Sequence, residues 1–285
     1  MQQERRWYQI EPLCRALRVS RGGYYSWLRG RGHKREMADS LLLSDIRRIY
    51  GDSNRNYGSP RIHRELRTAG VSCSKERVER LMRINGLRAK HKRKFKVATD
   101  SQHNLPVAPN LLAGRFSWER PDQAWAGDIT NISTEEGWLY LAVLLDLCSR
   151  RVVGWAMSQR ITRHLTLKAL QMAVQRRRPL PGLIHHTDQG SQYASQDYQN
   201  ALKSYGLISS MSGKGRCYDN AVAESFFHSL KVELVHGQRF NSREAAMSAI
   251  FKYMEVFYNN KRLHSTLDYM TPVAYEQQRA LPLVA

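Results

Sequence analysis

The pattern of residues 125–146, WAGDITNISTEEGWLYLAVLLD, indicates what kind of fold the second half of the chain adopts. A strand is expected over 123–133, and a short turn follows at 135–137. Residues 138–146 are apolar on both faces, which is typical of a central strand covered on both sides. A third strand is expected over 151–158, so the three strands should form an antiparallel meander.

Beyond this meander the sequence alternates between helical and strand patterns. Helices are expected over 164–178, 195–205, 219–234 and 242–260, and short strands over 183–188 and 207–211. Three strands followed by alternating helices and strands predict an α/β fold, with a mixed five-stranded sheet flanked by helices.

The charge of the chain is concentrated in its first third. The 285 residues carry a net charge of +20, and residues 1–100 hold 25 basic and 10 acidic side chains. A polyanion, either nucleic acid or an acidic membrane surface, is therefore the expected partner. A hydrophobic content of 42% excludes wholesale disorder. The longest apolar run has eight residues, so neither a membrane span nor a secretion signal is expected. The four cysteines are far apart and predict reduced cytosolic thiols.

The basic first third reads as two helix–turn–helix segments, over 1–45 and 46–100. In the second, a helix opening near Pro60 and a turn at residues 69–71 precede another helix capped by Ser72 or Ser74. That second helix fits a DNA major groove, although a small helical bundle with a solvated basic face remains an alternative. The candidate DNA contacts on it and on the basic arm that follows are Lys75, Arg77, Arg80, Arg83, Lys90, Lys92, Arg93, Lys94 and Lys96. Residues 101–114 are expected to be a linker to a domain at 115–285.

Three acidic residues stand out in that last domain. Asp128 lies within the first strand, Asp188 ends the strand LIHHTD, and Glu224 lies on the polar face of the helix over 219–234. Each has an ordinary alternative: Asp188 could cap a turn, and Glu224 could be solvated. Asp146 also lies near a strand end. Three carboxylates from separate elements can together hold two Mg²⁺ ions, which prefer oxygen ligands and can promote phosphodiester chemistry.

The spacing of these acids carries a resemblance. Thirty-five residues separate Asp188 from Glu224, and Lys231 follows Glu224 by seven. This resembles the D,D(35)E signature of retroviral integrases and related transposases. The segments HTDQGSQY, DNAVAESFFHSLKVEL and YNNKRLHSTLDYMTPVAYE resemble more narrowly the second-frame (OrfB) product of insertion-sequence-three-type bacterial transposases, and YGSPRIHREL resembles the segment before their core. The resemblance covers essentially the whole chain.

The resemblance implies an RNase H-like integrase core that cuts and rejoins DNA ends with two Mg²⁺ or Mn²⁺ ions. The catalytic and metal-binding residues would be Asp128, Asp188 and Glu224, and Lys231 would contact the DNA end. The family implies a bacterial, nucleoid-associated protein that forms a homo-oligomer on element ends and target DNA. Gln189 stands where the family usually has His, and it cannot titrate, so no proton transfer is expected there.

Some of the family's features are not visible in this sequence. Family members are commonly fused by frameshifting to a first-frame (OrfA) protein with a leucine zipper, and no heptad run occurs here. The chain therefore resembles the second frame alone, with the first-frame protein a further partner. Two other functions stay open: a non-catalytic DNA-binding regulator of transposition and a structure-specific nuclease.

Overall fold

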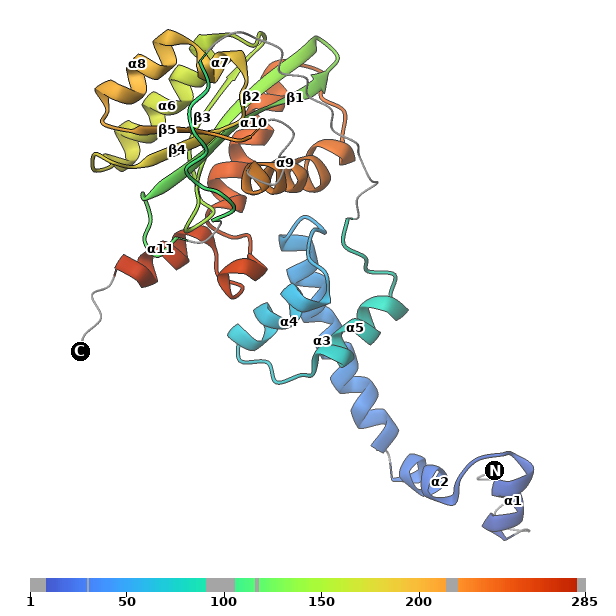
Figure 1. Cartoon of the computed structure of the whole chain (residues 1–285). Helices are drawn as coiled ribbons and strands as arrows, with labels where there is room; N and C mark the ends of the chain where they lie inside the picture. Colours follow the sequence, from blue (N-terminus) through green and yellow to red (C-terminus); the bar gives the residue numbers. More distant parts are fainter. Residues whose placement is uncertain (1–8, 30, 91–105, 116–117, 214–219, 281–285) are drawn as a thin grey trace, which may run out of the picture. The chain divides into compact units, whose positions relative to one another are not determined.

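The chain divides into two units, Met1–Ala89 and Lys90–Ala285, which are described one at a time. The computed structural model describes residues 9–29, 31–90, 106–115, 118–213 and 220–280 (Figure 1). The first unit is helical throughout its described part, and the second contains a sheet with helices on both faces. The prediction of an α/β core preceded by small helical segments is therefore confirmed.

The N-terminal unit contains a long helix that the sequence did not predict. Its elements are α1 (Ile10–Ala16), α2 (Arg21–Leu28), α3 (Arg31–Asp52), α4 (Ser59–Thr68) and α5 (Lys75–Ile84). Helix α3 runs continuously through residue 45, where the sequence suggested a boundary. Its buried apolar residues, Leu42, Ile46 and Ile49, all lie in its second half, whereas Met37 and Leu41 are exposed. A helix whose first half buries so little gives a weak periodic signal.

Helices α4 and α5 form the expected helix–turn–helix pair. Ile62 and Leu66 of α4 pack with Val78 of α5, and all three are fully buried. The connection turns at Gly70, whose φ of +81° is a conformation that glycine adopts without steric cost. Of the two candidate caps, Ser74 is the one used: its Oγ accepts the Arg77 N–H at 3.2 Å.

The sheet of the C-terminal unit has the strand order β3-β2-β1-β4-β5. The strands are β1 (Ala124–Thr134), β2 (Gly137–Asp146), β3 (Val152–Ser158), β4 (Ile184–Thr187) and β5 (Ile208–Met211). Strands β1, β2 and β3 are antiparallel neighbours, as predicted, and β4 and β5 join in parallel. Strand β1 is therefore central, with an antiparallel neighbour on one side and a parallel one on the other.

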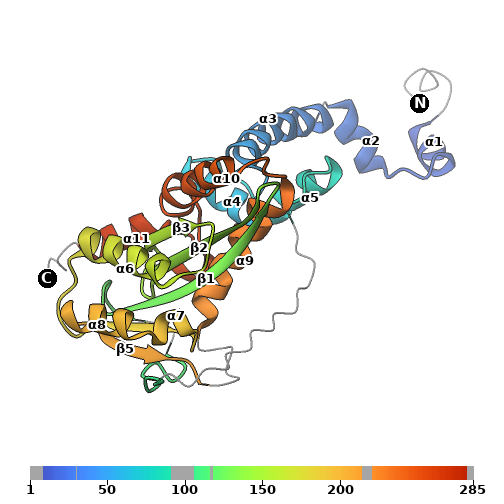
Figure 2. The ribbon, with the colours of Figure 1, turned by 90° about the horizontal axis from the view of Figure 1, so that it is seen from above.

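Helices cover both faces of this sheet (Figures 1 and 2). On one face, α6 (Arg163–Arg177), α7 (Ser191–Ala194) and α8 (Gln196–Ser204) enclose a core around Trp125. Helix α6 approaches β3 so closely that a Cβ on Gly154 would lie 2.4 Å from the Ala169 carbonyl oxygen. On the other face lie α9 (Ala221–Glu233) and α10 (Arg243–Phe251), which contact β1 and β2.

Three features of the C-terminal unit differ from the sequence predictions. The helix expected over 242–260 is α10 followed by a π-helical segment, η4 (Lys252–Tyr258). A further helix, α11 (Pro272–Ala280), lies near the end of the described chain. Short 3₁₀ turns occur at η3 (Val235–Gly237) and η5 (Ser265–Leu267). The expected linker is described from residue 106 onward, and there it packs on β5. The Leu111 N–H donates to Ser210 Oγ at 2.9 Å, and Leu112 is buried.

A buried ion pair fixes the end of α9. The Arg262 guanidinium donates to both Glu233 carboxylate oxygens, at distances down to 2.7 Å, and each side chain is only 8% exposed. The Tyr253 hydroxyl donates to the same carboxylate at 2.9 Å, and Arg262 also reaches Ser229 Oγ. The segment after α10 therefore holds the helix that carries Glu224 and Lys231.

Replacing Arg262 by Met should lower the free energy of unfolding by about 3 kcal/mol or more, because it leaves the Glu233 carboxylate buried without its counter-charge. Adding Glu233→Leu should recover much of this loss, since the double variant removes both charges. Urea unfolding of the full-length variants measures both values. A double variant no more stable than Arg262→Met would contradict this account of the pair.

Candidate active site

Asp128 lies on the central strand β1, opposite Val143 of β2. Its Oδ1 accepts the Ile129 N–H at 2.7 Å. Burial, and after it the charges of Asp188 and Glu224, raise the pKa of Asp128 from its usual value near 3.8 to about 8, although the Ile129 N–H and the Lys231 ammonium oppose the rise. The raised pKa of Asp128 thus reflects its burial first and the neighbouring carboxylates second.

Asp188 directly follows β4, the neighbouring parallel strand, at the position equivalent to Asp128. The register pairs Ala126 of β1 with His186 of β4, and each aspartate follows two residues later. Because alternate residues of a strand face the same side and parallel neighbours run in step, the two carboxylates should share one face. Asp188 Oδ1 also accepts the Gly190 N–H at 2.9 Å, so the side chain caps a turn as well, as the alternative interpretation suggested.

Glu224 comes from a third element, the first turn of α9. It is exposed, yet burial raises its pKa. Lys231 lies two turns further along the helix; burial lowers its pKa and the charge of Asp128 opposes that change. The Asn220 amide at the start of α9 donates to the Gly127 carbonyl at 3.4 Å and so ties α9 to β1 beside Asp128.

The three acids affect one another electrostatically but are not gathered at one point. Over residues 9–29, 31–90, 106–115, 118–213 and 220–280, no three His, Cys, Asp or Glu side chains converge closely enough to hold a metal ion. The carboxylates of Asp128, Asp188 and Glu224 nevertheless provide the oxygen donors that hard divalent cations prefer, and a cation would relieve their repulsion. In their chemistry, these side chains fit a divalent metal.

Asp146, the other acid near a strand end, has a structural function. It is fully buried, and its carboxylate accepts hydrogen bonds from the backbone of Asp122, Cys148 and Ser149 and from the Ser149 hydroxyl. Gln189 likewise holds a loop, because its amide donates to the Ser212 carbonyl at 2.9 Å. Neither side chain is available for chemistry in this arrangement.

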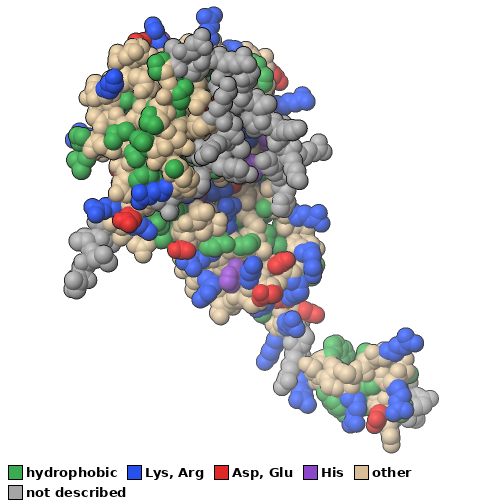
Figure 3. All heavy atoms as spheres, viewed as in Figure 1, with side chains coloured by type: hydrophobic (Ala, Val, Ile, Leu, Met, Phe, Trp, Pro, Cys, Tyr) green, Lys and Arg blue, Asp and Glu red, His purple; other side chains and the backbone are tan. Residues whose placement is uncertain are grey.

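The basic residues of α5 divide into two groups. Arg77 and Arg80 are half-buried, because each donates to the Asp39 carboxylate of α3 at 2.6–2.7 Å, and Arg80, with Arg77, lowers the pKa of Asp39. Arg77 and Arg80 are therefore already paired with an acid within the fold. Lys75 and Arg83 are exposed, and Lys and Arg side chains are spread over the visible face of the N-terminal helices (Figure 3).

The basic arm is described only at its beginning. Lys90 Nζ donates to the Glu233 carbonyl at the end of α9, at 2.6 Å. Lys92, Arg93, Lys94 and Lys96 lie outside the described residues.

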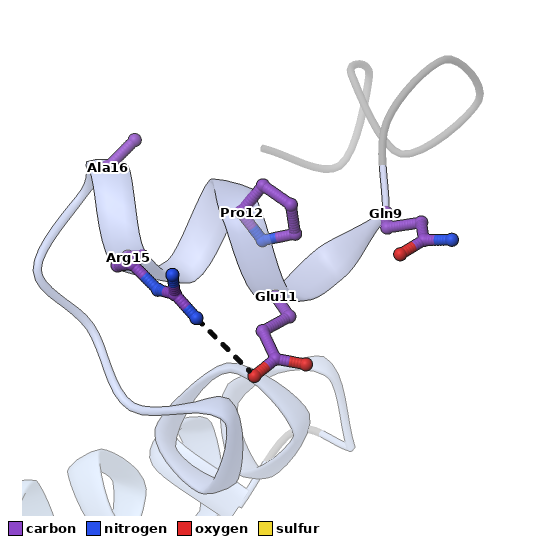
Figure 4. A pocket seen from close by; sticks show the side chains of 5 residues that line it. All are labelled: Gln9, Glu11, Pro12, Arg15 and Ala16. Carbon is purple, nitrogen blue, oxygen red and sulfur yellow. Dashed lines mark ion pairs between the residues drawn. The ribbon is translucent and has the colours of Figure 1, made fainter.

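A shallow pocket on α1 is unrelated to the acids. It is lined by Gln9, Glu11, Pro12, Arg15 and Ala16 (Figure 4). Its charged groups, Glu11 and Arg15, form a pair at 3.8 Å, and their side chains are 59% and 84% exposed. Such an exposed pair contributes little binding energy and offers no enclosed site.

Known proteins resemble the chain over nearly its whole length. Two families described as integrase core domains match the chain, one over residues 119–217 and the other over residues 224–280. A family described as an HTH-like domain matches residues 37–95. Transposase InsF for insertion sequence IS3A of Escherichia coli is 47% identical over 277 residues, which cover 95% of each chain. The chain belongs to the IS3 family of transposases. It is accordingly a transposase with an integrase core and an HTH-like domain.

Two further proteins show similarity to this IS3-family transposase. The uncharacterized 31 kDa protein of insertion element IS600 from Shigella sonnei is 44% identical over 93% of this chain and 98% of its own. Among solved structures, the simian T-cell lymphotropic virus intasome in complex with PP2A regulatory subunit B56 gamma contains a similar chain. The two chains are 16% identical with a TM-score of 0.48, and the match covers 84% of this chain and 76% of the intasome chain. No described helix of the transposase is long and apolar enough to cross a membrane.

Sequence reasoning missed two residues near the acids. Asn220 and Tyr193 stand in the sequence analysis only as letters of the segments DNAVAESFFHSLKVEL and HTDQGSQY. No periodicity or residue spacing in the sequence indicates either residue, because each is singled out only by its contacts with residues distant in the sequence. Both have a buried oxygen without a hydrogen-bond partner among the described residues.

Replacing Asp128 by Asn should raise the thermal unfolding midpoint of the metal-free transposase. The increase should be larger at about pH 8 than at about pH 5. In the folded state Asp128 keeps a proton up to about pH 8, whereas the unfolded chain releases it near 3.8, so folding becomes less favourable as the pH rises between these values. Thermal unfolding with a chelator tests this. A gain that did not vary with pH would contradict the raised pKa.

Proposed function

We propose that this transposase cuts the ends of its insertion sequence at their 3′ sides and joins them to target DNA, with Asp128, Asp188 and Glu224 holding two divalent cations, Mg²⁺ or Mn²⁺. The observation that supports this most is the raised pKa of Asp128, which burial causes first and the charges of Asp188 and Glu224 increase. A site that forces a carboxyl group to keep its proton to about pH 8 gains most from a bound cation, since the cation lets all three carboxylates ionise together.

The side chains around the cations would have distinct functions. Two bound metal ions supply an activated attacking oxygen and stabilise the departing one at the phosphodiester. Asp128 and Asp188 come from adjacent strands of a rigid sheet and would fix the position of that chemistry. Glu224 would complete the ligand set from α9. Lys231, on the same face of α9, would neutralise a phosphate of the DNA end.

The N-terminal unit would hold the DNA. The segments 1–45 and 46–100 carry most of the net charge, and α5 is the second helix of the helix–turn–helix pair. We infer that Lys75 and Arg83, which are exposed, contact phosphates or base edges, while Arg77 and Arg80 keep α5 packed on α3 through Asp39. Lys90 and the arm residues Lys92, Arg93, Lys94 and Lys96 would follow the DNA backbone, and 101–114 would join this part to the core at 115–285.

We also infer that several copies act together. An insertion sequence has two ends, and one set of three carboxylates can act on one end at a time, so joining both ends needs a homo-oligomer on the DNA. A first-frame (OrfA) protein would be an additional partner. Both inferences place the protein with the bacterial chromosome in the cytoplasm.

Each of Asp188→Asn and Glu224→Gln should lower cleavage and joining of a labelled element end by about 100-fold or more, because the lost charge acts on the transition state. Binding of the same DNA should stay within a few-fold of the wild type, since the grip depends on the N-terminal unit. Gel assays with Mg²⁺ measure all three quantities.

Asp197→Asn is the matched control for this test. Asp197 is half-exposed and pairs with Arg163 on the surface, so its loss should change neither activity nor binding. If the wild type bound the end without cutting it, the chain would be a non-catalytic regulator. Cutting without joining would indicate a nuclease, and near-normal joining by either variant would remove that residue from the site.

Replacing Lys75 and Arg83 together by Ala should reduce the slope of log affinity against log salt by about 2 on duplex DNA, because each phosphate contact contributes about 0.9. The control is Lys203→Ala, an exposed basic residue of α8, which should leave the slope unchanged. Fluorescence anisotropy of the full chain at several salt concentrations gives the slopes. An unchanged slope in the double variant would exclude phosphate contacts by both residues.

A further inference from the structure

Two buried tyrosines lie side by side under the carboxylate strands, and they differ in one respect. Tyr193 of α7 and Tyr198 of α8 are 2% and 0% exposed, and their ring centroids are 5.3 Å apart. The Tyr198 hydroxyl lies 2.7 Å from His185 Nε2 and shares a hydrogen bond with it. The Tyr193 hydroxyl is equally buried but has no hydrogen-bond partner among the residues that the structure describes.

An unpartnered buried hydroxyl is unfavourable for folding. It loses its hydrogen bonds to water and gains none in exchange. A phenylalanine would fill the same space between His185 and Tyr198 without this cost. The Tyr193 hydroxyl is therefore expected to gain a partner in another state of the protein.

The surroundings of Tyr193 indicate which state that is. The Tyr193 N–H donates to the Gly190 carbonyl at 3.0 Å, and the Gly190 N–H donates to Asp188 Oδ1 at 2.9 Å, so one turn of chain joins the tyrosine to that carboxylate. Burial first, then Tyr198, Asp128 and Asp188, raise the pKa of Tyr193 well above its usual value. Tyr193 therefore keeps its proton and can donate it in a hydrogen bond to a carboxylate oxygen.

Close packing also places the tyrosine pair's neighbour His185 against the strand that carries Asp128. His185, which contacts both tyrosine rings, packs against β1 at Gly127, where a Cβ would lie 2.8 Å from His185 Cε1. Only glycine leaves room for the imidazole at that position. The residue before Asp128 thus allows the aromatic cluster to support the strand from below.

We propose that Tyr193 is a positioning residue of the carboxylate site: when divalent cations bind, its hydroxyl donates a hydrogen bond to the Asp128–Asp188 carboxylate pair and fixes the orientation of these ligands. This inference rests on the proposed function, because it requires those aspartates to bind the cations. Hydrogen bonds that orient metal ligands typically change metal affinity by about 10-fold to 100-fold.

The test compares Tyr193→Phe with Tyr198→Phe in the full chain. Without metal, Tyr193→Phe should keep or raise the thermal unfolding midpoint, because it removes an unpartnered hydroxyl. Tyr198→Phe should lower the midpoint, because it breaks the bond to His185. Calorimetric titration with Mn²⁺ should show about 10-fold or greater loss of affinity in Tyr193→Phe, and wild-type affinity in correctly folded Tyr198→Phe.

Several results would overturn the inference. His185 Nδ1 is another buried atom without a partner among the described residues, and it is the competing acceptor. If Tyr193 donated to it in the metal-free protein, Tyr193→Phe would lower the midpoint as Tyr198→Phe does. Wild-type Mn²⁺ affinity in Tyr193→Phe would also contradict the proposal.

Asp188→Asn separates this inference from the proposed function. If Mn²⁺ affinity falls in Asp188→Asn but not in Tyr193→Phe, the carboxylate site stands and the role of Tyr193 is refuted. If the wild type binds no Mn²⁺, both are refuted. Loss of affinity in both variants, with an undiminished metal-free midpoint in Tyr193→Phe, supports both.

Discussion

The burial of Asp128, beside the charges of Asp188 and Glu224, is the constraint on which the candidate site of the C-terminal unit depends. Asp128 pairs with Val143 of β2, and β4 joins β1 over residues 124–126, directly before Asp128, so the sheet fixes this part of β1 near the charges of Asp188 and Glu224. The free energy that this arrangement costs must be offset by packing elsewhere in the unit. A preorganised site of this kind is typical of enzymes, because no reorganisation is then needed during the reaction.

Paired charges away from the site provide part of that support. Arg177 of α6 donates to the carboxylates of both Asp122 and Glu276, and so ties α11 to the start of the sheet. Arg262 and Glu233 form the corresponding pair at the end of α9. In both places the charges neutralise each other within hydrogen-bonded geometry, which is the condition under which buried charges are tolerated. Glu224 and Lys231 therefore project from a helix anchored by groups outside the site.

Much of this structure could be predicted from the sequence, because much of it follows from local pattern. The strand of residues 137–146, the helix that carries Glu224 and the position of Asp188 after a strand are all visible in the spacing of apolar residues. What could not be predicted depends on contacts between distant residues. The polar first half of α3 has little periodicity, and the π-helical segment after α10 deviates from any regular helical period. The hydroxyl of Tyr193 differs from that of Tyr198 only through its three-dimensional neighbours.

Contacts between distant residues also decide how many of the basic side chains in the sequence remain available for DNA. Net charge counts every basic residue, but folding uses some of them before DNA arrives. Asp39 pairs with both Arg77 and Arg80, and these residues lie 38 and 41 positions from it, so no reading of α5 alone reveals the pairing. The charges that remain exposed on α5, Lys75 and Arg83, lie on a helix whose orientation the two arginines fix. Part of the positive charge of α5 thus positions the helix, and the proposed DNA contacts depend on the part that remains exposed.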